Sequence, residues 1–79
     1  MVQATACAPV DPTAQFAENL RRLRLDAGFT QEALSEVTKI DTGEISRLER
    51  GTRDPQLRTL VRLARGLRRP VTDLVAGIE

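Results

Sequence analysis

The chain has 79 residues, of which 29% are charged, and a formal net charge of +1, which suits one small domain and excludes a two-domain enzyme with a deep cleft. It contains no histidine, one cysteine and only two aromatic residues, so the sequence predicts no disulfide framework, no metal site and an aliphatic core. No apolar run has the length of a membrane span or a secretion signal, and we expect a cytoplasmic protein that needs no cofactor.

The basic residues are unevenly distributed along the chain. Eleven of the twelve are arginine, and residues 51–69 contain six arginines but a single acid, Asp54. Arginine binds phosphate groups and guanine edges through its planar fork. A GC-rich genome also enriches arginine, so composition alone leaves open both a nucleic-acid partner and a coding bias.

Residues 1–12 are small and polar and show no periodicity, which predicts a flexible N-terminal tail ahead of a folded domain over residues 13–79. Asp11 or Thr13 can cap a first helix, and Pro12 is tolerated at its start. Apolar residues then recur at three- and four-residue steps until Ala27, where Gly28 is a typical helix stop.

A second helix is predicted to begin at Gln31 and to end near Thr38. Thr30 precedes it as the N-cap residue. Two apolar residues, Leu34 and Val37, are expected on its buried face.

The third predicted helix follows a turn of about three residues. Asp41 can cap it, and Glu44 can reach back in a capping-box arrangement. Ile45 and Leu48 form its buried stripe, and Gly51 ends it. Because so short a connection makes two helices cross steeply, the pair is typical of a helix-turn-helix.

A fourth helix is predicted after Asp54, a plausible cap, and Pro55, a first-turn proline. Its apolar residues recur with helical spacing as far as Leu67. Pro70 then starts a short fifth helix. The sequence therefore predicts an all-α domain of five helices.

Several short motifs occur in a definite order: Leu23-Arg24 with Gly28 downstream, Thr30-Gln31-Glu32, Ile45-Ser46, Leu48-Glu49-Arg50-Gly51 and the Pro-x-Leu of the fourth helix. Together they resemble the phage-repressor-like, Xre-type helix-turn-helix family over residues 16–75. The resemblance implies a compact, five-helix, lambda-repressor-like domain that binds double-stranded operator DNA as a homodimer. It also implies that the helix over residues 42–50 enters the major groove.

The turn between the second and third helices departs from the family pattern. A glycine is common there, and this chain has Lys39. A non-glycine residue with positive φ is uncommon. Either Lys39 is strained, the turn has a different shape, or the second helix runs longer.

The outward face of the third helix supplies the candidate base contacts. Arg47 can form a bidentate contact with guanine, and Thr42 can meet a thymine methyl or a phosphate. Glu44 can either cap the helix or accept from a cytosine amino group, and we favour the cap. Ser46 can be limited to backbone or water contacts. Gly43 lets the backbone approach DNA, and we expect Gly43→Ala to raise stability or leave it unchanged.

The resemblance also assigns residues outside that face. The family glutamine that matches Gln31 contacts a phosphate, and a helix N-terminus favours an anion. Arg50 and Arg53 flank the third helix and are expected beside phosphates, with ordinary surface charge as the alternative. Arg24 and Glu49 match a pair that forms an internal salt bridge in the family, so these two residues are assigned to structure.

The last helix is the expected dimer interface, since no separate dimerisation domain follows it. Its candidate residues are Val71, Leu74, Val75 and Ile78, and the alternative is that they complete the monomer core, as we expect for Leu74. The short chain resembles the controller proteins of restriction-modification systems. A general small repressor or activator is a second reading. A third is the antitoxin of a toxin-antitoxin pair, with the tail and Cys7 as the toxin-masking segment. No residue set predicts an enzyme.

Overall fold

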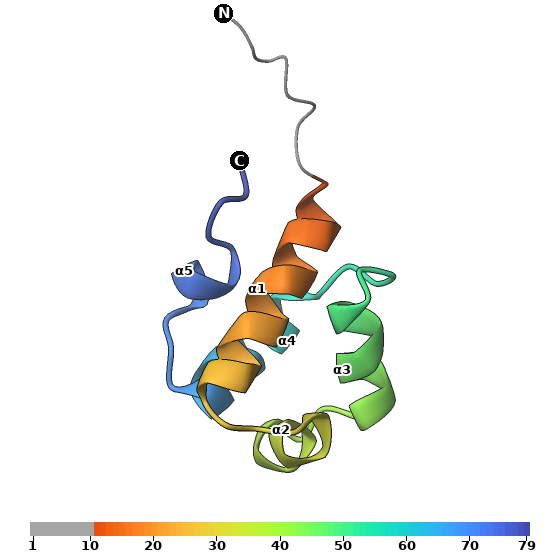
Figure 1. Ribbon diagram of the computed structural model, residues 1–79, viewed down its shortest axis with the longest axis vertical. Helices are drawn as coiled ribbons and strands as arrows, with labels where there is room; N and C mark the ends of the chain where they lie inside the picture. The colour runs from red at the N-terminus through yellow and green to blue at the C-terminus, as the bar shows by residue number, and fades with distance from the viewer. Residues whose placement is uncertain (1–10) are drawn as a thin grey trace, which may run out of the picture.

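The computed structural model describes residues 11–79, and these form five helices around one apolar core (Figure 1). The helices are α1 (Pro12–Asp26), α2 (Gln31–Thr38), α3 (Thr42–Glu49), α4 (Leu57–Leu67) and α5 (Val71–Leu74). The predicted all-α, five-helix fold is therefore confirmed. Most of the predicted tail, including Cys7, lies outside the described residues, and Pro12 already belongs to α1. None of these helices combines the length and apolar character that crossing a bilayer requires.

Helix α1 is the central element of the fold. It contacts α3 on one side and α5 on the other, while α2 and α4 pack on each other (Figure 1). Every helix contributes one apolar stripe, because so short a chain must use each stripe to build a single core. The largest fully buried apolar side chains are Leu20, Leu34, Ile45, Leu48, Leu63 and Leu74.

The helix ends follow the predicted capping chemistry at several positions. The Asp11 carboxylate accepts from the Ala14 amide at 3.0 Å, which caps the start of α1. Gly28, with φ of +79°, ends α1 in a left-handed turn. Lys39 adopts φ of +60° between α2 and α3, so the first of the three readings of this turn is the one observed: a lysine in the left-handed region.

Two predictions about the helices are wrong. Val37 is 52% exposed, because the buried side of α2 follows Leu34 and Thr38, four residues apart, and Val37 lies beside that row. Helix α4 begins at Leu57 instead of near Asp54. The segment before it stays outside the helix, where Pro55 lines an apolar groove with residues of α1 and the C-terminal segment.

Asn19 is a buried polar residue that fixes the C-terminal end of the fold. Its side-chain amide donates to the carbonyl of Leu74 at 2.9 Å and to the carbonyl of Ala76 at 2.8 Å. Its side-chain oxygen accepts from Gln15 at 3.0 Å. Since α5 has a single turn of helix, these bonds supply the anchoring that its own backbone cannot.

Gly66 allows α2 and α4 to approach closely. A Cβ atom at this position would lie 2.5 Å from the Cγ2 of Thr38 and 3.3 Å from the Cγ2 of Val37. Any larger residue would push the two helices apart. The absent side chain therefore sets the spacing behind the helix-turn-helix.

Candidate nucleic-acid interface

The third helix separates an apolar inner face from a polar outer face. Ile45 and Leu48 are fully buried, and the Asp41 carboxylate caps the helix by accepting from the Gly43 amide at 2.9 Å. The outer face consists of half-buried or exposed residues, namely Thr42, Gly43, Ser46, Arg47 and Arg50. The predicted base-reading residues therefore share one surface.

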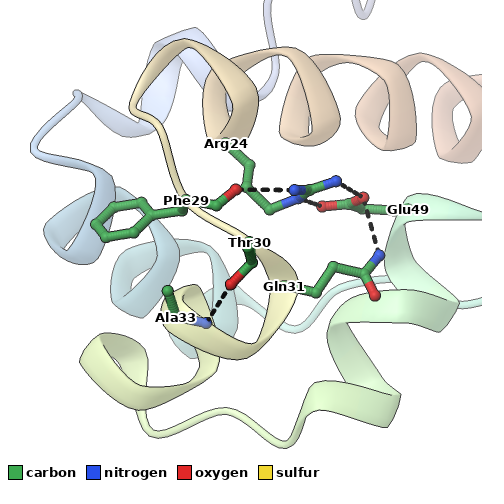
Figure 2. A network of polar contacts seen from close by, with 6 residues as sticks. All are labelled: Arg24, Phe29, Thr30, Gln31, Ala33 and Glu49. Atoms are coloured by element: carbon green, nitrogen blue, oxygen red, sulfur yellow. Dashed lines mark hydrogen bonds and ion pairs between the residues drawn. The ribbon is translucent and has the colours of Figure 1, made fainter.

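A polar network holds α3 against α1 and the start of α2 (Figure 2). Arg24 donates from Nε to Oε2 of Glu49 at 2.6 Å and from Nη2 to Oε1 at 3.0 Å. Its third contact, from Nη1, is to the carbonyl of Phe29 at 2.9 Å. The two charged side chains are only 11% and 5% exposed. The hydrogen bond to Glu49 raises the pKa of the Arg24 guanidinium, so Arg24 stays charged.

Gln31 belongs to the same network, a contact that sequence reasoning missed. Its side-chain amide donates to Oε1 of Glu49 at 3.1 Å, as Figure 2 shows. The hydroxyl of Thr30 caps α2 by accepting from the Ala33 amide at 3.0 Å. The first amides of α2 remain without intrahelical partners, as at any helix N-terminus. Glu49 therefore orients the side chain that was predicted to contact a phosphate.

The Glu44 side chain does not cap the start of α3, the role that we favoured from the sequence. Its Oε1 lies 3.2 Å from Nη1 of Arg53 and 3.6 Å from Nη2 of Arg47. The capping-box interpretation is wrong, because two guanidinium groups draw the carboxylate toward the end of the helix and Asp41 caps alone. Glu44 links the outer face of α3 to the loop that follows it.

The surroundings of Gly43 decide between the two outcomes expected for Gly43→Ala, raised or unchanged stability. A Cβ atom there would lie 2.8 Å from the capping oxygen of Asp41 and 3.5 Å from Nη1 of Arg47. Alanine gains about 1 kcal/mol in helix propensity. A disturbed cap loses about as much. We therefore expect no stabilisation from this substitution.

The remaining predicted contact residues lie toward the C-terminal end of α3. Arg50 donates from Nη1 to the hydroxyl of Ser46, so Ser46 has a local partner. Arg50 is exposed, and the side chain of Arg53 is 50% exposed. Both guanidinium groups are accessible beside α3.

The C-terminal segment offers less apolar surface than predicted. Leu74 is fully buried in the monomer, which confirms the expectation that it completes the core and removes it from the interface candidates. Val71, Val75 and Ile78 are half-buried, and Val71 and Ile78 pack against the core. Leu57 is 74% exposed at the start of α4.

Several arginines of the basic segment gather away from these contacts. Arg62, Arg65 and Arg68 line a shallow hollow between α2 and α4, together with Phe29 and Val37. Within residues 11–79, no group of three or more metal-ligating side chains comes together.

Comparison with known proteins places this geometry among regulators. The helix-turn-helix family HTH_3 matches residues 20–74 of the chain. The fold is similar to that of the restriction-modification controller protein C.AhdI from Aeromonas hydrophila, with 31% identity, 78% of this chain and 94% of that chain covered, and a TM-score of 0.76.

Two further structures show the same similarity. The clp gene regulator ClgR from Corynebacterium glutamicum is 26% identical over 89% of this chain and 74% of that chain, with a TM-score of 0.82. The controller protein C.Esp1396I, solved as a tetramer with its natural 35 base-pair operator, is 26% identical over 78% of this chain and 82% of that chain, with a TM-score of 0.73. No curated protein sequence matches the chain.

Proposed function

The chain belongs to the helix-turn-helix family, and from that membership we propose that it is a transcriptional regulator that binds a pseudopalindromic DNA operator as a homodimer. Helix α3 is the recognition helix, and residues 42–50 lie in the major groove. The observation that carries the proposal is the polar outer face of α3, held rigidly from behind by the Arg24–Glu49 pair.

Rigid support matters because base readout requires side chains at fixed positions. Ile45 and Leu48 anchor the inner face of α3 in the core, and Glu49 fixes its C-terminal end to α1. The outer face is thereby positioned before any DNA arrives. Little ordering of the α3 backbone remains to be done on binding, which favours affinity.

Base reading is assigned to the side chains on that face. Arg47 makes the main specific contact, a bidentate contact with guanine, which is worth about 1–3 kcal/mol of discrimination. Thr42 meets a thymine methyl or a phosphate. The missing side chain of Gly43 leaves room for the helix to approach the bases.

Phosphate contacts flank the base contacts. On one side, Gln31 lies at the N-terminus of α2, where free amides and the helix dipole favour an anion. On the other side, the exposed guanidinium groups of Arg50 and Arg53 supply affinity that depends on salt and not on sequence. Together these contacts fix the register of α3 on the duplex.

A dimer extends the reading to two half-sites about 34 Å apart. The exposed Leu57 and the half-buried Val75 and Ile78 are the apolar residues that support this assignment. The controller protein C.AhdI is 31% identical over 78% of this chain, so among regulators of this family we favour a restriction-modification controller.

Selection of bound sites from a random duplex pool tests the DNA-binding proposal. The wild-type protein should enrich a palindrome with half-sites one helical turn apart. Arg47→Ala should lose preference at one position in each half-site. Arg58→Ala, which removes an exposed arginine of α4, should retain the full pattern. No enrichment at low salt would overturn the proposal.

Sedimentation of the free protein tests the dimer. We expect the wild type to be dimeric at micromolar concentration and Leu57→Asp, combined with Val75→Asp, to be monomeric, because both changes place charge on an apolar contact surface. Circular dichroism should show unchanged helix content. A wild type that is monomeric with and without DNA contradicts the dimer.

A further inference from the structure

We propose that Glu44 sets the sequence specificity of the recognition surface by holding Arg47 and Arg53 in the free protein. This inference rests on the proposed function, because it concerns the same surface. It assigns Glu44 a positioning role in place of a helix cap or a direct base contact.

The geometry of the cluster is the first step. A single oxygen of Glu44 faces both guanidinium groups, at 3.2 Å from Arg53 and 3.6 Å from Arg47. The Glu44 side chain is only 24% exposed, whereas those of the two arginines are 43% and 50% exposed. The carboxylate is therefore the inner partner, and the guanidinium groups of the two arginines are its more exposed outer partners.

Arg47 is held closely within this cluster. Its guanidinium lies over Gly43, with Nη1 at 3.5 Å from where a Cβ atom would stand. Its Nε is buried and has no hydrogen-bond partner among the described residues. A buried donor without a partner is unfavourable. Glu44 thus holds Arg47 in a folded-back conformation. Arg47 can leave it when a better hydrogen-bond partner is offered.

The Glu44 carboxylate then affects the binding affinity for operator and for non-operator DNA to different extents. Any duplex offers phosphates to Arg47 and Arg53. To bind them, the two arginines must leave Glu44, and the negative charge of the DNA comes close to the Glu44 carboxylate. Only an operator adds a guanine edge for Arg47 in return. Discrimination improves when a contact penalises wrong partners more than the right one. Glu44 lowers affinity for all DNA and lowers it most for non-operator DNA.

The test is Glu44→Gln, with Glu36→Gln as the matched control that removes one exposed negative charge from α2, away from this cluster. Binding to the selected operator and to a scrambled duplex is measured over a range of salt concentrations. We expect Glu44→Gln to bind the scrambled duplex about 3- to 10-fold more tightly, as befits the loss of two weak ion pairs. Operator affinity should rise less, so the specificity ratio falls.

The salt dependence identifies the cause. If both released arginines take up a phosphate, the slope of log K against log salt should steepen by about 1 to 2, at about 0.9 per phosphate. In an Arg53→Gln background, Glu44→Gln should steepen the slope by about half as much. Glu44→Asp should restore part of the wild-type ratio.

Three outcomes would overturn the inference. The first is a specificity ratio that Glu44→Gln changes no more than Glu36→Gln does. The second is lost preference at one base pair with an unchanged salt slope, which would make Glu44 a direct reader of cytosine. The third is observed in the free protein by nuclear magnetic resonance: guanidinium rotation in Arg47 and Arg53 as fast as in Arg58. If the wild type binds no duplex, the proposed function is wrong. Slow guanidinium rotation that Glu44→Gln abolishes would still show that Glu44 holds the two arginines in the free protein.

Discussion

Helix α1 carries two buried polar side chains that hold opposite sides of the domain by different chemistry. Toward its C-terminal end, Arg24 forms a charged pair with Glu49 of α3. Closer to its middle, Asn19 donates two neutral hydrogen bonds to carbonyls at the end of α5. Leaving a buried charge without its partner lowers the free energy of unfolding far more than leaving a neutral buried group without a hydrogen-bond partner. Helix α3 therefore has the stronger anchor, and α5 has the weaker one.

Removing the charged anchor should have the largest effect. Arg24→Met leaves Glu49 buried without its partner and should lower the free energy of unfolding by about 3 kcal/mol, the lower end of the usual range because the pair is slightly exposed. Urea denaturation measures this loss. The double variant Arg24→Met/Glu49→Leu should recover much of it. If Arg24→Met alone is as stable as the wild type, the ion pair is not the stronger anchor.

Removing the neutral anchor should cost less and act locally. Asn19→Ala leaves the carbonyls of Leu74 and Ala76 without donors and should lower the free energy of unfolding by about 2 kcal/mol. Amide hydrogen exchange should quicken in residues 71–78 while α3 keeps its protection. Equal loss of protection in both regions would show that the two anchors are not independent.

Removing the charge of Asp11, the exposed N-cap residue that precedes α1, should give the smallest effect. The hydroxyl of Thr13 and then the amide of Ala14 donate to its carboxylate and lower the pKa of Asp11 below 3.8. The stabilisation is complete above the unfolded-state pKa and is lost as the pH falls through the lowered value. Asp11→Asn still caps the helix, so stability should match at neutral pH and decline less in acid. Thermal unfolding as a function of pH measures this, and parallel curves would contradict it.

Local sequence patterns predicted the helices well because capping and periodicity act over a few residues. Thr30 and Gly28 are examples, and the Arg24–Glu49 pair was suggested by a family resemblance. Contacts that depend on how helices pack were not predictable in this way. Asn19 reads as an ordinary polar position until α5 is seen beside it, and nothing local marks Gly66 as the contact point of two helices.

For the candidate site too, the sequence predicted the local features but not the contacts between elements. The outer face of α3 followed from the burial of Ile45 and Leu48, which helical periodicity indicates. The partners of its charged side chains did not follow. Glu44 has a capping position in the sequence, but Arg53 reaches it from a loop whose path depends on where α4 begins.

Lys39, the left-handed residue between α2 and α3, is also the single lysine of the chain. It is exposed, whereas the next residue, Ile40, is 7% exposed. A lysine-specific protease therefore has one target bond, and it can cut only when Ile40 leaves the core. The rate of that single cleavage reports how often the two helices separate, and its slowing by an added duplex would measure how tightly DNA closes the motif.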